Sequence, residues 1–158
     1  MRKDEFMNKV EMVCSVARLV KQEEEEFVSH ALYEDKSGDP IMIPMEASTQ
    51  EGKEEFALML RGYLKKKKAD NLIMVADVYY TRFKKNEDRA MIRPSQDPSR
   101  KEAINIYYEC ITDDHGLIQG SIVMDYKDNG GIISFKEKRL IDAKSVSGYM
   151  ANFLTKGD

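Results

Sequence analysis

Apolar residues near the N-terminus recur every three or four positions, which is the period of an amphipathic helix. This pattern covers residues 4–35. One continuous helix over this range would be about 48 Å long, while a chain of this size has a radius of gyration of about 15 Å. We therefore expect either a break near Lys21–Glu26 that gives two helices, or an overhang that packs against another subunit. The apolar positions are Phe6, Val10, Val13, Ala17, Val20, Phe27 and Ala31, widened by Met7, Cys14, Val28 and Leu32.

Turn residues separate this region from a second helical pattern. Residues 37–40, Ser-Gly-Asp-Pro, are typical of a turn, and a short strand is predicted at 41–45. A proline inside that strand restricts it to a sheet edge or a bulge. A helix is predicted over about 49–68, where Ser48 and Glu51 have the spacing of a capping box. Its predicted apolar face consists of Phe56, Met59, Leu60, Tyr63 and Leu64.

The later part of the chain has the period of β-strands. Residues 72–83 form a long apolar run that is apolar on both faces at its start, which predicts a central strand. Over about 103–138, apolar and polar residues alternate and glycine-containing turns interrupt them, which predicts a three-stranded antiparallel meander. The segment 139–158 stays open between loop and short helix. Its one helical face would contain Val146, Tyr149, Met150 and Phe153.

These elements predict a single α+β domain over residues 1–158, with an antiparallel β-meander sheet packed against N-terminal helices. The expected order is one or two helices, a strand, a helix, four strands and a C-terminal helix. A chain of 158 residues suits one domain, which buries roughly 70% of its unfolded surface. With 42% hydrophobic residues, the composition is too apolar for a disordered chain.

Charge and cysteine content narrow the class of protein. The 25 Lys and Arg residues nearly balance the 28 Asp and Glu residues, so no long-range field attracts nucleic acid or an anionic membrane. The N-terminus has no apolar signal-peptide region, and no apolar run approaches the length of a membrane span. Cys14 and Cys110 are expected to be buried, inert thiols. The sequence thus predicts a cytoplasmic protein without membrane association.

The segment 84–102 is the first candidate for function, because structureless loops longer than about 12 to 15 residues are uncommon in compact domains. Two prolines and several Asp and Ser residues restrict its conformation. Four charged residues here are placed either to hold the loop at the sheet edge or to receive a polar ligand, and both interpretations stay open. They are Arg93, Asp97, Arg100 and Glu102.

A short motif overlaps this loop. Residues 94–104 are Pro-Ser-Gln-Asp-Pro-Ser-Arg-Lys-Glu-Ala-Ile. This run resembles a P-S-x-D-P-x-R-x-E-A-[aliphatic] signature of uncharacterised prokaryotic and phage proteins, in which it also lies between two strands. The resemblance implies family membership and draws attention to Asp97, Arg100 and Glu102, but it implies no activity.

Asp77 is a carboxylate within the apolar strand. By strand parity it shares a face with Ile73 and Val75. A buried carboxylate must find a partner or shift its pKa upward, and both situations occur at functional sites. A structural ion pair, exposure to water and a functional role all stay open for Asp77.

Other chemistry-bearing residues carry weaker signals. Asp113, Asp114 and His115 are metal-ligand types, but they also suit a tight turn and would need distant partners. Lysines 65–68 suit the negative end of the preceding helix. The chain contains no Walker loop, no GxGxxG fingerprint and no HExxH or GxSxG motif. We therefore expect no metal, no cofactor and no known catalytic motif.

Three classes of function stay open. The preferred one is an interaction or regulatory module, expected to be a homodimer that uses the long N-terminal helix or the meander edge. The second is a small enzyme or polar-ligand-binding protein with a site between the loop 84–102 and Asp77. The third, disfavoured by the charge balance, is a nucleic-acid-associated protein that uses local basic residues. Those residues are Arg61, Lys65–Lys68, Arg82, Lys84 and Lys85.

Overall fold

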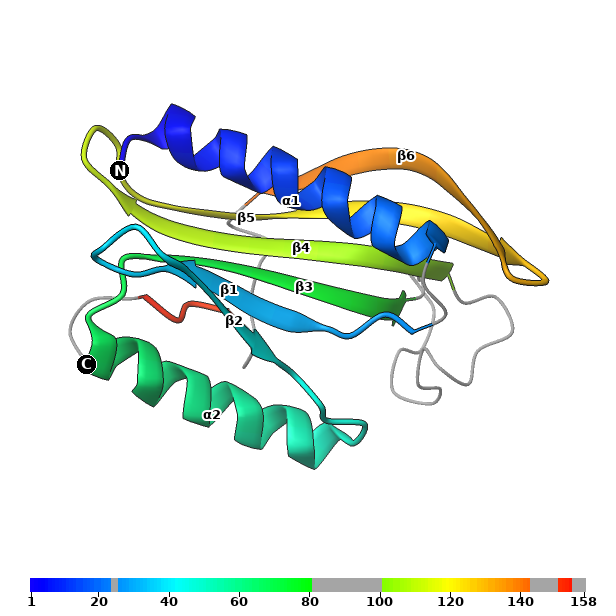
Figure 1. The fold of residues 1–158 in the computed structure, drawn as a ribbon, viewed down its shortest axis with the longest axis horizontal. Helices are drawn as coiled ribbons and strands as arrows, with labels where there is room; N and C mark the ends of the chain where they lie inside the picture. Colours follow the sequence, from blue (N-terminus) through cyan, green and yellow to red (C-terminus); the bar gives the residue numbers. More distant parts are fainter. Residues whose placement is uncertain (24–25, 81–100, 143–150, 155–158) are drawn as a thin grey trace, which may run out of the picture.

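The protein folds as an α+β domain around one antiparallel sheet (Figure 1). The structure, a computed structural model, describes residues 1–23, 26–80, 101–142 and 151–154. The predicted α+β class with an antiparallel sheet is confirmed. The elements within the described residues are α1 (Lys3–Glu23), β1 (His30–Glu34), β2 (Pro40–Pro44), α2 (Gln50–Lys67), β3 (Asn71–Tyr80), β4 (Lys101–Thr112), β5 (Gly116–Asn129) and β6 (Ile132–Asp142).

The sheet has the strand order β2-β1-β3-β4-β5-β6, and every neighbouring pair is antiparallel. The strands β4, β5 and β6 are the predicted meander, and β2 lies at an edge, one of the two positions that Pro44 allowed. Asn129 pairs with Ile132, so Gly130 and Gly131 form the two-residue turn between β5 and β6. Both glycines have positive φ, 64° and 94°, which matches the twist of a tight hairpin.

The prediction of helical structure as far as residue 35 is wrong. The helix α1 ends at Glu23, and His30–Glu34 forms the strand β1. Along β1 the side chains alternate between half-buried and buried, with Ala31 and Tyr33 buried. In a segment of five residues, the apolar positions fit a helical stripe and a strand almost equally well. Pairing with β2 on one side and β3 on the other decided in favour of the strand.

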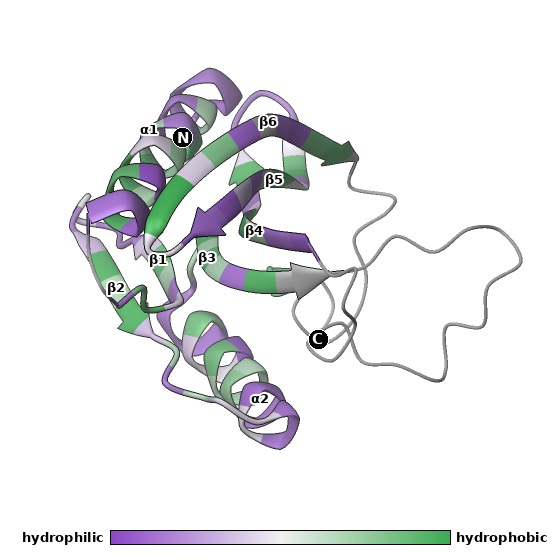
Figure 2. Cartoon of the chain, turned by 90° about the vertical axis from the view of Figure 1, so that its right-hand side faces the viewer, coloured by the Kyte–Doolittle hydropathy of each residue, from purple (hydrophilic) through white to green (hydrophobic). Residues whose placement is uncertain are grey.

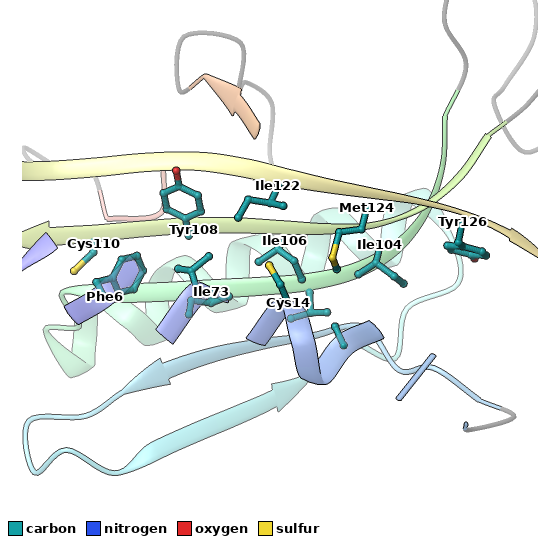
Figure 3. Close-up of a cluster of buried hydrophobic side chains, with 13 residues drawn as sticks. Phe6, Cys14, Ile73, Ile104, Ile106, Tyr108, Cys110, Ile122, Met124 and Tyr126 are labelled. Carbon is teal, nitrogen blue, oxygen red and sulfur yellow. The ribbon is translucent and has the colours of Figure 1, made fainter. Parts of the chain in front are cut away.

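The two helices cover opposite faces of the sheet (Figure 2), so each face has its own apolar core. The α1 core is drawn in Figure 3 and joins one side of α1 to the central strands. It contains Phe6, Val10, Cys14, Ala17, Ile73, Val75, Ile104, Ile106, Tyr108, Cys110, Ile122, Met124 and Tyr126. The α2 core contains Ala31, Tyr33, Ala57, Leu60, Leu64, Leu72, Met74, Tyr107, Ala151, Phe153 and Leu154.

The helix α2 begins and ends close to the predicted residues, with two corrections. Its N-cap is Thr49, whose hydroxyl accepts a hydrogen bond from the Gly52 N–H at 3.0 Å, so the predicted Ser48 cap is wrong. The side chain of Met59, predicted to face the core, is exposed. At the other end, Lys68 adopts the left-handed conformation that closes many helices.

The glycine at position 120 allows an aromatic ring to lie across β5. Gly120 pairs with Tyr108 on β4, and a Cβ atom at Gly120 would lie 2.6 Å from the Tyr108 hydroxyl oxygen. The Tyr108 ring also meets Phe6 of α1 edge to face, with centroids 6.1 Å apart. Gly120 therefore leaves the space in which Tyr108 supports the packing of α1.

Candidate functional site

Asp77 lies in the second half of β3, on the face that α1 covers. One carboxylate oxygen accepts a hydrogen bond from Lys21 Nζ at 2.7 Å, and the other accepts one from the Tyr126 hydroxyl at 2.6 Å. The Lys21 ammonium also lies 4.9 Å from the centre of the Tyr126 ring. The carboxylate of β3 is thus joined to the last turn of α1 by an ion pair and to β5 by a hydrogen bond.

Glu102 is the second predicted residue that the structure places. It pairs with Tyr79 on β3 and with Tyr126 on β5, while Asp77 pairs with Ile104. Asp77 and Glu102 are therefore diagonal neighbours on the same face, a relationship that typically separates Cα atoms by about 7–8 Å. The pairing register therefore places these two residues on one face of neighbouring strands. The other predicted residues, Arg93, Asp97 and Arg100, lie outside the described residues.

The acidic turn at residues 113–115 holds the start of α1. The N-terminal amine forms an ion pair with Asp113 at 2.9 Å, and Asp114 accepts a hydrogen bond from the Lys3 N–H at 2.9 Å. This contact satisfies one of the free N–H groups at the helix N-terminus. Across the described ranges, no three His, Cys, Asp or Glu side chains are grouped to hold a metal ion.

The basic residues considered for nucleic acid have other roles where they are described. Arg61 donates a hydrogen bond to the Ala151 carbonyl oxygen at 2.6 Å, and its guanidinium lies 4.4 Å from the centre of the Phe153 ring. Lys65, Lys66 and Lys67 occupy the last turn of α2, where cations stabilise the helix dipole. The residues Arg82, Lys84 and Lys85 lie outside the described part of the chain.

A second apolar stripe runs along α1 on a side that the sheet does not cover. Its three large side chains are Met12, Val16 and Leu19, which are 68%, 54% and 53% exposed. Exposed residues of this size are normal when scattered, but a contiguous patch indicates an interaction site. The spacing of four and then three residues is that of a coiled-coil seam.

An apolar groove continues this stripe toward the β1–β2 hairpin. It has a volume of about 330 Å³, and Met12, Leu32 and Ile73 are among its lining residues. Met42 pairs with Leu32 in the hairpin and is itself 62% exposed. The stripe and the groove form one surface, which we call the α1 surface: Met12, Val13, Val16, Leu19, Leu32 and Met42.

Charged residues flank the α1 surface along the helix. Lys9 and Glu23 each lie seven residues from Val16, and both are exposed. Lys9 forms an ion pair with Glu34 of β1 within the chain. The alternation of three and four residues from Lys9 to Glu23 is visible in the sequence. It was missed because the stripe beginning at Phe6, which packs on the sheet, explained the helix by itself.

Comparisons with known proteins give no family for this chain. No model of a protein family, no curated protein and no solved structure matches it. Within the described residues, neither helix has the length and apolar character needed to cross a membrane. By its fold, the chain is an α+β protein. Its helix α1 has one apolar side packed on the sheet and a second apolar side that is exposed.

Proposed function

We propose that this protein is an interaction module that self-associates through the α1 surface. The observation that carries the proposal is the exposure of Met12, Val16 and Leu19 at coiled-coil spacing, next to an apolar groove. Burying such side chains contributes roughly 25 cal/mol per Å² of apolar area. A second copy of α1 supplies an identical stripe, as a two-fold symmetric interface requires.

The charges at the ends of the stripe favour an antiparallel arrangement. When two copies of α1 cross with Val16 on the two-fold axis, Lys9 of one copy lies opposite Glu23 of the other, because both are seven residues from Val16. The same symmetry places Met12 close to Leu19 of the second copy. A parallel arrangement would instead set like charges against each other. The helix is therefore self-complementary in charge as well as in apolar pattern.

The sheet edges are weaker candidates for the interface. The edge strand β2 begins and ends with proline, which removes backbone donors and opposes the addition of another strand. The opposite edge, β6, carries Lys136, Lys138 and Arg139. Charged residues on an edge strand hinder pairing with another chain. Of the two routes to a homodimer expected from the sequence, α1 has the stronger support.

The polar-ligand hypothesis has less support. Both Asp77 oxygens already accept a hydrogen bond, from Lys21 and from Tyr126. A ligand that used this carboxylate would have to displace one of these partners. The proximity of Asp77 and Glu102 agrees with the hypothesis, but the ion pair accounts for Asp77 without a ligand.

The mass of the protein in solution tests the proposal. We expect sedimentation equilibrium to show a dimer with a micromolar dissociation constant, since the exposed stripe is smaller than a standard interface of about 800 Å² per partner. Val16→Arg should give a monomer, because it places a charge on the two-fold axis. Leu58→Arg is the matched control, since Leu58 is 72% exposed on α2. A monomeric wild type at about 100 µM, or a dimer that Val16→Arg leaves intact, would refute the proposal.

Disulfide trapping tests the geometry. In a Val16→Cys variant, the two new thiols should lie close enough for a mild oxidant to link two chains. The Leu58→Cys variant should remain unlinked under the same conditions. Equal linking of the two variants would show that the copies do not meet at α1.

A further inference from the structure

The segment Ala151–Leu154 lies against the sheet face that α2 covers (Figure 1, red). It is not a strand of the sheet. The N–H groups of Phe153 and Leu154 donate hydrogen bonds to the two oxygens of Glu109, each at 2.7 Å. Asn152, the residue before them, has a φ of 60°, in the left-handed region. Successive backbone N–H groups in such a conformation form a concave anion-binding nest, and here the anion is a side chain of β4.

Glu109 is fully buried, so its carboxylate depends on these donors. A third hydrogen bond comes from the Tyr107 hydroxyl, two residues earlier on the same face of β4. The Tyr107 oxygen in turn accepts the Asn152 N–H at 2.9 Å. Burial, followed by this contact with Glu109, raises the pKa of Tyr107, so the hydroxyl stays protonated and able to donate at neutral pH.

The segment is held through its side chains as well as through its backbone N–H groups. The Arg61 guanidinium of α2 binds the Ala151 carbonyl oxygen and lies over the Phe153 ring. The Gln119 amide of β5 donates to the Asn152 side-chain oxygen at 2.8 Å. Phe153 and Leu154 are both buried in the α2 core. An amide, an aromatic ring and an aliphatic side chain are thus recognised in order.

We propose that this groove, formed by Arg61, Tyr107, Glu109 and Gln119, is a peptide-binding site for short segments of the type Ala-Asn-Phe-Leu. The chain's own residues 151–154 are the occupant in this structure. The partner is a peptide of the same chemistry supplied in trans: two successive free N–H groups, with an aromatic residue followed by an aliphatic one. The groove lies on the opposite sheet face from the α1 surface and is independent of the proposed self-association.

The buried carboxylate determines how exchange occurs. Removing the segment would leave Glu109 buried without two of its three hydrogen bonds, and an uncompensated buried charge is strongly unfavourable. A molecule that only fills the apolar space does not restore these bonds. A competing occupant must therefore present two adjacent backbone N–H groups, which is what a peptide does.

Peptide binding in trans is the direct test. The protein is the full chain with Phe153→Ala and Leu154→Ala, which weakens the internal occupant and leaves the groove residues unchanged. The probe is a fluorescent peptide of residues 149–158, and its control has Ala in place of Phe153. We expect the variant to bind the probe at least tenfold more tightly than the control peptide, and at least tenfold more tightly than wild type binds it. Adding Glu109→Gln to the variant should reduce the affinity at least tenfold.

Two outcomes would overturn the proposal. The first is a folded variant, checked by circular dichroism, that binds neither peptide or binds both equally. The second comes from hydrogen exchange on the wild-type protein and holds even where the variant fails to fold. If the Phe153 and Leu154 amides exchange at the rate of the interior β4 amides, the segment is inseparable from the core. Exchange at least tenfold faster shows that the segment undocks on its own and supports the proposal.

Discussion

Tyr107 and Glu109 lie two residues apart on β4 and are joined by a hydrogen bond on the face that α2 covers. Glu109 is fully buried, and its other donors are backbone N–H groups of Phe153 and Leu154. A buried carboxylate is tolerated when hydrogen bonds replace the water it has lost. This pair therefore connects the segment Ala151–Leu154 to β4 in the middle of the sheet.

The Glu109→Gln variant should be less stable than wild type. The amide keeps the shape of the side chain but replaces one accepting oxygen with a donor that faces other donors. We expect the free energy of unfolding in urea to fall by roughly 1–3 kcal/mol. Glu102→Gln, at a half-buried position on the same strand, is the control and should change it by less than about 0.5 kcal/mol. An unchanged unfolding midpoint for Glu109→Gln would contradict the role of the carboxylate.

The Lys21–Asp77 ion pair should contribute measurable coupling. Their side chains are 18% and 27% exposed, so water screens the pair only in part. A double-mutant cycle with Lys21→Met and Asp77→Asn should give a coupling free energy of about 0.5–1 kcal/mol. The Lys138–Glu11 pair, with side chains 41% and 53% exposed, is the matched surface control and should couple more weakly. Equal coupling in both cycles would show that partial burial does not strengthen the Asp77 pair.

The two cysteines should resist alkylation in the folded protein. Burial raises the pKa of both Cys14 and Cys110 to about 11. At pH 8, a thiol with this pKa is ionised in only about one molecule in a thousand, and the thiolate is the reactive form. We expect iodoacetamide at pH 8 to leave the native protein unmodified by mass spectrometry and to label both cysteines after denaturation. Rapid labelling of either cysteine in the native state would contradict the packing of the α1 core.

The attachment of α1 to the β4–β5 turn should depend on pH at both ends of the range. The hydrogen bond from the Lys3 N–H, more than any other contact, holds the pKa of Asp114 below its ordinary value of 3.8. Because the folded-state pKa is lowered, this contribution is present above that value and is lost as the pH falls through the lowered pKa. The N-terminal amine behaves in the opposite way. Asp113 raises its pKa above 8.0, so its contribution is present below that value and is lost as the pH rises through the raised pKa.

Variants of Asp114 test the effect at low pH. The difference in melting temperature between wild type and Asp114→Ala should be largest at about pH 5 to 7 and should shrink toward pH 3. Asp114→Asn retains an oxygen that can accept the Lys3 N–H and should recover part of the loss. A difference that stays constant down to pH 3 would show that the Asp114 charge does not stabilise the start of α1.

Short-range sequence patterns were enough to predict those elements whose pattern fits only one kind of secondary structure. Alternation of apolar and polar residues after residue 103, interrupted by glycine-containing turns, predicted the meander, because this period is typical of strands. Pro44 predicted an edge strand or a bulge, because proline cannot donate to a neighbouring strand. Counting along the strand placed Asp77 on the same face as Ile73 and Val75. Each of these conclusions needs only the local geometry of the chain.

Other features depended on which segments meet. The sequence by itself determined the antiparallel meander, a helix over about residues 49–68 and the amphipathic character of the N-terminal segment. Only the tertiary structure decided that residues 30–34 form a strand, that Glu109 binds the C-terminal segment and that the stripe of Met12, Val16 and Leu19 stays uncovered. The reason is physical: periodicity specifies which side chains share a face, whereas burial depends on what packs against that face from elsewhere in the chain.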